Sequence, residues 1–148
     1  ALAIGDVLVA QDWGQYLEAA FARRTPKGWQ TPAPIPPGAP ANWFFIHPHG
    51  TIVGNAAAPP QRRFRLPADP GLLALARATL QGLQLERCVP ASAGMRAGSS
   101  LCLPRTPRII VGGTGVSAGI FADNAEFRRY LQRAWGARIL DMESAAVV

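Results

Sequence analysis

Two acidic side chains bracket a methionine in the sequence "ARILDMESAAVV" (residues 137–148). A short apolar run, typical of a strand, comes directly before Asp141, and small residues from Ser144 onward indicate the start of a helix. Two acids at a strand-to-helix junction suggest a functional site. The structural alternative is that Met142 lies in the core and that Glu143 is a charge favoured by the N-terminus of a helix.

A second candidate is the glycine-rich stretch "GGTGVSAG" (residues 112–119), which follows the apolar run "PRIIV". Gly113, Gly115 and Gly119 give the spacing G-x-G-x-x-x-G, one residue longer than the dinucleotide-binding fingerprint. The next expected helix begins only near Asn124, too late for its N-terminus to face a pyrophosphate at these glycines. We therefore expect a loop at the carboxyl end of a strand, lining a ligand crevice.

The histidines and cysteines carry weaker patterns. His47 and His49 form an H-x-H pair that could be half of a metal site, but the chain has no third histidine and the proline between them suits a turn, so no metal is expected. Cys88 and Cys102 flank a turn-rich segment that is flexible enough to close a disulfide, and two reduced thiols are the alternative. A disulfide indicates an oxidising compartment, which favours a periplasmic or secreted location over the cytoplasm.

Composition sets further limits. The chain has 148 residues, of which 49% are hydrophobic and 16% charged, which suits one folded domain and does not indicate disorder. No apolar run reaches the roughly 18 residues needed to span a bilayer, so no membrane partner is expected. The net charge is +6, but the basic residues are scattered and lack an aromatic stacking pattern. A solvated basic surface is therefore expected, and no nucleic-acid partner.

Strand and helix patterns alternate along the chain, which predicts an α/β fold with a largely parallel sheet. Residues 13–24 suit either a short helix or an extended segment, and the proline-dense residues 25–66 are expected to form an irregular loop insertion. The strongest helix has an amphipathic pattern with caps offered by Asp123 and Asn124 and a stop at Gly136. The expected strands are 3–10, 42–47, 107–111 and 137–143, and the expected helices are 70–83, 124–135 and a segment from 144 onward.

Three stretches together resemble one family. "VGGTGVSAGIFADNAEFRRYL" (residues 111–131), "ARILDMESAAVV" and "IGDVLVAQDW" (residues 4–13) are similar to the nucleoside phosphorylase/nucleosidase superfamily of type I. The forms "DMESAA" and "TGVSAGIFADN" look closest to the nucleosidase-like branch that includes plant bark and vegetative storage proteins. The resemblance covers residues 3–10 and 105–148, and residues 11–104 match weakly. It implies a three-layer α/β/α phosphorylase-type fold with a mixed, largely parallel central sheet.

The resemblance also implies roles for individual residues. Glu143 matches the carboxylate that accepts hydrogen bonds from the ribose hydroxyls, and Met142 would lie against the ribose face. Phe121 matches the ring that stacks on the purine base, and backbone groups such as those of Ala122 would read the base edge. Asp141 occupies the first acidic position of the motif and is counted with the substrate-binding residues.

The implied reaction is cleavage of the N-glycosidic bond of purine nucleosides through an oxocarbenium-like transition state. Hydrolysis of the methylthioadenosine/S-adenosylhomocysteine type is expected, with phosphorolysis, or a non-catalytic nucleoside-binding or storage role, as alternatives. The implied partners are a purine nucleoside, water or phosphate, and a second subunit in a dimer, without a cofactor. Residues 1–148 are expected to be an inactive internal part of the domain, because the family's nucleophile-handling residues and purine-protonating aspartate are not found in them.

Overall fold

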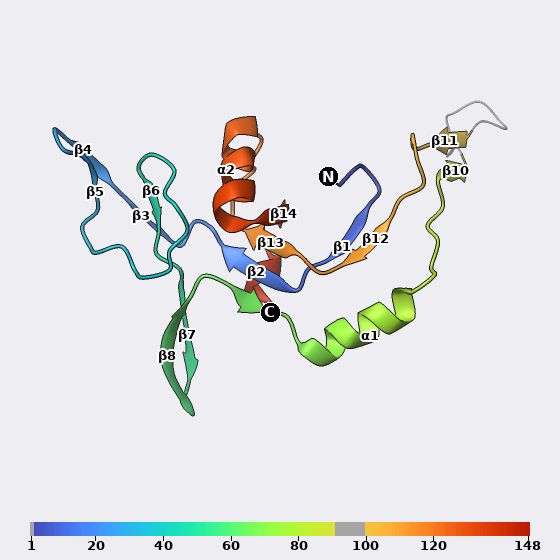
Figure 1. The fold of residues 1–148 in the computed structure, drawn as a ribbon, viewed down its shortest axis with the longest axis horizontal. Helices are drawn as coiled ribbons and strands as arrows, with labels where there is room; N and C mark the ends of the chain where they lie inside the picture. The colour runs from blue at the N-terminus through green and yellow to red at the C-terminus, as the bar shows by residue number, and fades with distance from the viewer. Residues whose placement is uncertain (1, 91–99) are drawn as a thin grey trace.

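The computed structural model describes residues 2–90 and 100–148, which form a mixed α/β protein (Figure 1). At its centre lies a small mixed sheet with the strand order β14–β13–β2–β9. Its strands are β14 (Ala137–Asp141), β13 (Thr114–Ser117), β2 (Asp12–Gln15) and β9 (Leu66–Pro67). The first three run parallel and β9 is antiparallel to β2, so the α/β prediction with a mixed, largely parallel sheet is confirmed at this level.

The described residues contain two α-helices, α1 (Pro70–Leu80) and α2 (Ala125–Trp135). α2 begins and ends as its sequence predicts: the Asn124 side chain accepts a hydrogen bond from the Phe127 N–H at 2.8 Å, and Gly136 takes the left-handed conformation with φ of 63°. Its apolar face packs onto the sheet in one core of buried residues, Tyr16, Ile46, Val116, Ala118, Phe127, Tyr130, Leu131 and Trp135. Burying each large side chain contributes about 1.5–3 kcal/mol, so this core is what holds α2 to the sheet.

Two glycines let tryptophan rings lie flat against the central strands. A Cβ at Gly14 would lie 2.8 Å from the ring of Trp135, and one at Gly115 would lie 2.4 Å from the ring of Trp13. Gly115 was expected within a loop over residues 112–119, and the structure corrects this: it lies inside β13. Only Gly112 and Gly113, with φ of 123° and 85°, form the turn before that strand.

The other described strands pair two by two. The pairs are β1 (Val7–Val9) with β12 (Ile109–Val111), β3 (Ala19–Phe21) with β6 (Ile46–Pro48), β4 (Arg23–Thr25) with β5 (Gly28–Gln30), β7 (Thr51–Asn55) with β8 (Ala58–Arg63), and β10 (Cys88–Pro90) with β11 (Ser100–Cys102). Residues 13–24 are therefore extended rather than helical, and the range 25–66, expected to be irregular, contains hairpins (Figure 1). Prolines are tolerated in β8 because this strand pairs only with β7 and keeps a free edge.

Smaller differences occur at element ends. The Asp69 side chain caps α1 by accepting a hydrogen bond from the Leu72 N–H at 2.9 Å, as predicted, but the helix ends at Leu80, before Gly82 with φ of 78°. The aromatic strand predicted at 42–47 begins only at Ile46, because Phe44 lies in a turn with φ of 50°. The helix predicted from residue 144 is a single 3₁₀ turn, η1 (Ser144–Ala146), in the described chain. No helix in the described residues is long and apolar enough to cross a membrane.

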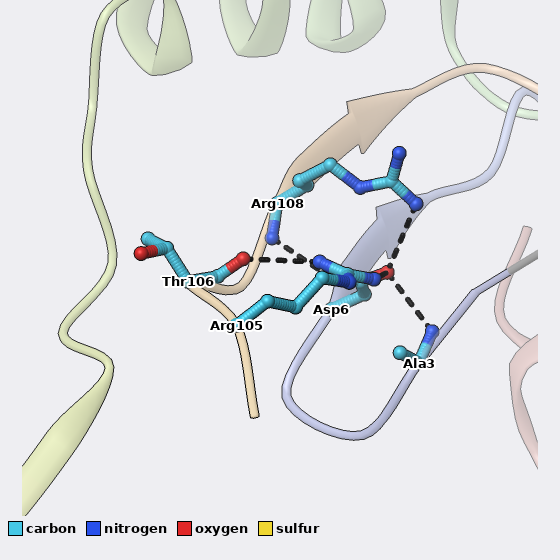
Figure 2. A network of polar contacts seen from close by, with 5 residues as sticks. All are labelled: Ala3, Asp6, Arg105, Thr106 and Arg108. Atoms are coloured by element: carbon cyan, nitrogen blue, oxygen red, sulfur yellow. Dashed lines mark hydrogen bonds and ion pairs between the residues drawn. The ribbon is translucent and has the colours of Figure 1, made fainter. Parts of the chain in front are cut away.

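Asp6 ties the start of β1 to the start of β12 (Figure 2). Its side chain has no exposed surface, and it accepts hydrogen bonds from both terminal nitrogens of Arg105, at 2.9 and 2.5 Å. The backbone N–H groups of Ala3 and Arg108 also donate to it, at 3.0 and 2.9 Å. These contacts, led by that of Arg105, hold the pKa of Asp6 well below its usual range.

Candidate functional site

Three parallel strands of the central sheet end side by side. In the strand register Ser117 of β13 lies opposite Gln15 of β2 on one side and opposite Asp141 of β14 on the other. η1 follows β14 directly and packs against β13 and β2. In open α/β sheets ligands bind outside the carboxyl ends of the strands, so this edge is where a site is expected.

The carboxylate of Asp141 links the end of β14 to η1. The Ser117 hydroxyl donates to one carboxylate oxygen at 2.6 Å, and the Ser144 N–H donates to the same oxygen at 3.2 Å. The Ser144 hydroxyl donates to the second oxygen, and the Glu143 N–H adds a further hydrogen bond. Ser117 accepts in turn from the Ala145 N–H at 3.0 Å. Protein groups therefore occupy both oxygens of Asp141.

These contacts determine the protonation of Asp141. Partial burial favours the neutral acid, but the hydrogen bonds from Ser117, Ser144 and the Glu143 N–H outweigh it and hold the pKa of Asp141 below its ordinary value. All of these donors are neutral. In the part of the chain that the structure describes, no lysine or arginine forms an ion pair with Asp141. The site therefore keeps a negative charge.

Glu143, two residues after Asp141, differs from it in exposure and in hydrogen bonding. Its side chain is exposed and, among the described residues, has neither a hydrogen bond nor an ion-pair partner. It precedes η1 but does not cap it, and a single 3₁₀ turn provides only a small dipole, so the structural interpretation of Glu143 as a helix-start charge has little support. Met142 between them is 36% exposed, which argues against a role in the core.

The loop between β13 and α2 leaves the same edge of the sheet. Phe121 in this loop is 89% exposed, so its ring is open to a ligand. Ala122 is half-buried, and its carbonyl accepts a hydrogen bond from Arg128 at 3.1 Å. Arg128 also pairs with Asp123 at 3.2 Å. Arg128 thus fixes the loop that carries Phe121 to the first turns of α2.

The sequence interpretation missed Ser117. Its side chain is fully buried and donates a hydrogen bond to Asp141 at 2.6 Å. It lies 24 residues before Asp141 in the chain, and only the parallel register of β13 and β14 brings the two together. The one sequence signal was a polar residue directly after the apolar Val116, at the end of a strand. Ser144 was expected only as the first residue of a helix.

The other candidates lie elsewhere. Within residues 2–90 and 100–148 no cluster of three or more histidine, cysteine or acidic residues is placed to hold a metal. His47 is buried, and both of its ring nitrogens lack hydrogen-bond partners among the described residues. His49 comes directly after β6. Cys88 and Cys102 form a disulfide at facing positions of β10 and β11. A cavity of 420 Å³ lies between α2 and β14, and its lining does not include Asp141.

The fold and site define a mixed α/β protein with two carboxylates at the carboxyl ends of parallel strands. Comparison of the chain with protein-family models, curated proteins and solved structures finds no match. A functional interpretation therefore depends on the residues and their geometry.

Proposed function

We propose that this chain supplies the ribose- and base-binding part of a purine nucleosidase, which cleaves the N-glycosidic bond by hydrolysis. One observation carries the proposal: of two neighbouring acids at the carboxyl edge of the sheet, Asp141 accepts hydrogen bonds from protein donors, whereas Glu143 has no such donor among residues 2–90 and 100–148. A carboxylate without protein partners at such an edge is suited to a ligand that donates hydrogen bonds. The two hydroxyls of a ribose are such donors.

Glu143 would act mainly in the transition state. As the bond to the base breaks, positive charge develops on the sugar ring, and a carboxylate bound to the ribose hydroxyls is increasingly attracted to it. Removing one preorganised electrostatic contact of this kind costs about 10²–10³ in kcat. Met142, unbranched and partly exposed, would provide an adaptable apolar surface for the ribose face.

The base would bind on the β13–α2 loop. The exposed ring of Phe121 is available to stack on a purine, and the adjacent backbone of Ala122 would meet the base edge. Because the Ala122 carbonyl already accepts from Arg128, its N–H is the better candidate for that contact. Arg128 acts here as a positioning residue.

Asp141 is assigned a positioning role rather than direct contact with substrate. Its hydrogen bonds to Ser117 and Ser144 hold the end of β14 against η1, and Glu143 lies between these two fixed points. The orientation of Glu143 therefore depends on Asp141. This refines the expectation that both acids bind the substrate directly.

We place these elements in a three-layer α/β/α phosphorylase-type fold, working as a dimer with water as the nucleophile. The parallel strands β2, β13 and β14, the packing of α2 on them, and the motifs at residues 4–13, 111–131 and 137–148 support this placement. In that fold residues 1–148 would form part of one domain.

The test is release of free base from adenosine, inosine, methylthioadenosine and S-adenosylhomocysteine by the purified full-length protein that contains residues 1–148, followed by chromatography with and without phosphate. Ribose as the second product supports hydrolysis, and ribose 1-phosphate formed only with phosphate supports phosphorolysis. Calorimetry with the same nucleosides detects binding without turnover, as a storage or binding role requires. No turnover and no binding of any of these compounds would remove the assignment.

A further inference from the structure

The net charge of the chain is concentrated in one region. Residues 19–68 contain six basic residues and no aspartate or glutamate, so they account for the whole net charge of +6. Three of these cations lie on or next to the β4–β5 turn: Arg23, Arg24 and Lys27. All three are exposed, and in the described chain their side chains have no hydrogen-bond or ion-pair partner. Their charge is therefore available to an external anion.

Exposed aromatic rings accompany these cations. Phe21 is 63% exposed, and Trp29 and Phe45 are also exposed. The Phe45 ring lies 5.4 Å from that of Phe21 and 5.9 Å from that of Trp29, so the three form one cluster. In the hairpin register Trp29 lies opposite Arg24, which places a ring and a cation side by side. We call the set Phe21, Arg23, Arg24, Lys27, Trp29 and Phe45 the aromatic–cationic patch.

The position of the patch suits contact with a large surface. The β4–β5 hairpin forms one end of the long axis of the molecule, away from the central strands β2, β13 and β14 (Figure 1). A hollow of 370 Å³ lies beside the rings, lined by Phe21, Arg23, Gln30, Thr31 and Pro32. It combines a guanidinium, an amide and a hydroxyl with apolar walls, a combination that suits a phosphate headgroup.

We propose that the aromatic–cationic patch docks the protein on the surface of an anionic lipid bilayer. Tryptophan rings sit at the headgroup level of membranes, and phenylalanine contributes to the apolar face of segments that bind there. Each nearby lysine or arginine adds attraction to anionic lipid. This is binding to a surface and not a span, and it revises the expectation of no membrane partner, which was based on the lack of a long apolar run.

Two other occupants fit less well. A single-stranded nucleic acid needs ring faces free to stack on successive bases, but Phe21 meets Phe45 edge to face at 87° and Trp29 lies tilted over Phe45 at 54°. A second copy of this chain would place the same cations against each other, which is unfavourable. The proposal is independent of the nucleosidase assignment.

The experiment is cosedimentation of the purified protein with vesicles of phosphatidylcholine alone or mixed with phosphatidylglycerol. Binding is expected only to the anionic vesicles and should weaken as salt is added. Lys27→Glu should weaken it about tenfold or more, because the reversal changes the charge by two units and each charge near the surface contributes about 1 kcal/mol. Arg77→Glu is the matched control, because it makes the same change in net charge at an exposed position of α1. It should leave binding nearly unchanged.

A second measurement concerns Trp29. Its emission should shift to the blue on anionic vesicles, and Trp29→Phe should abolish that shift while circular dichroism shows an unchanged fold. The proposal is overturned if neutral vesicles bind equally well, or if Arg77→Glu weakens binding as much as Lys27→Glu. Tighter binding to a single-stranded oligonucleotide than to anionic vesicles at the same salt would overturn it in favour of nucleic acid.

Discussion

Asp6 and Asp141 are both held ionised next to parallel strands, but with opposite kinds of partner. Asp6 comes before β1 and is bound by the side chain of Arg105 and the backbone of Arg108, as Figure 2 shows. Asp141 ends β14 and is bound by hydroxyl and backbone N–H donors. The charge of Asp6 is neutralised inside the protein, and the charge of Asp141 is not.

This difference indicates a structural role for Asp6 and a role in a binding site for the region of Asp141. An ion pair around a buried carboxylate satisfies it internally and leaves nothing for a ligand to add. At the carboxyl end of β14, Asp141 and Glu143 place two negative charges close together, and no cation is paired to either of them in the described residues. A ligand that donates hydrogen bonds and becomes positive during reaction would be stabilised there. Each prediction below tests one side of this comparison.

The largest effect is expected at Glu143. In the full-length protein that contains this chain, Glu143→Gln keeps the shape and loses the charge, so kcat/KM for nucleoside cleavage should fall on the order of 10²-fold or more, with an unchanged melting temperature. Glu143→Ala should be worse, and Asp141→Asn should have a smaller effect. Glu86→Gln, at an exposed loop position, is the control and should have the wild-type rate.

Two results would contradict this order. If Glu143→Gln turned over nucleoside normally while Asp141→Asn was inactive, Asp141 would be the acid that faces the sugar. If neither change affected turnover and both lowered the melting temperature, the motif would be a structural turn.

The next effect is expected at Ser117. Ser117→Ala removes the donor to Asp141 and leaves the Ala145 N–H without an acceptor, so unfolding free energy should fall by about 1–3 kcal/mol. Activity should fall as well, because Glu143 is held through the same contacts. Chemical denaturation and steady-state kinetics measure the two effects, and Thr106→Ala, at an exposed position, serves as the control. Unchanged stability in Ser117→Ala would show that this network does not hold η1 in place.

The sequence predicts those parts of the fold and of the candidate site that depend on contacts between residues close together in the chain. α2 was predicted together with its ends, because its cap at Asn124, its apolar spacing and Gly136 all act within a few residues. The strand before Asp-Met-Glu was predicted for the same reason, although it was expected to run to Glu143 and β14 ends at Asp141. The contact of Ser117 with Asp141 was not, because it requires the register of two parallel strands joined through α2. The sequence does not encode that register locally.

The hairpins between residues 19 and 67 were missed for a different reason. Proline-rich composition was interpreted as irregular structure, but two-stranded antiparallel pairs have free edges and tolerate residues without an N–H. The basic residues were interpreted from the sequence as scattered, and the lack of acidic residues around those at 23–65 was not used. The concentration of all the net charge in residues 19–68 becomes informative once β4 and β5 place three of those cations beside exposed rings.

Acid titration tests the two aspartates together. Both have a pKa below the ordinary 3.8, so each stabilises the fold fully above that value and progressively less as the pH falls through its lowered pKa. Wild-type stability should therefore decline from about pH 4 downward. Asp6→Asn should flatten that decline more than Asp141→Asn, because the pKa of Asp6 is held well below its usual range by an arginine. Asp123→Asn, with a fully exposed carboxylate, should not flatten it. If stability declined equally with falling pH in the wild type and all three variants, neither the contacts of Asp6 nor those of Asp141 would favour the ionised carboxylate.

The smallest effect on the central fold is expected from the disulfide. Cys88 and Cys102 join β10 to β11, whose described side chains are exposed, and the hairpin continues only through hydrogen bonds between Arg87 and Leu103. A disulfide closing a loop of about 15 residues is worth roughly 3 kcal/mol if the loop unfolds with the rest of the protein. A hairpin with so little packing can open by itself, so that stabilisation should remain local. The double substitution Cys88→Ser, Cys102→Ser should therefore change the main melting transition less than Ser117→Ala and leave kcat/KM unchanged. Amide hydrogen exchange of the paired residues Val89 and Leu101 should become faster. Mass mapping of unreduced protein made in an oxidising compartment should find the two cysteines linked. If removing them lowered the temperature of the main melting transition strongly, this hairpin would belong to the cooperative core.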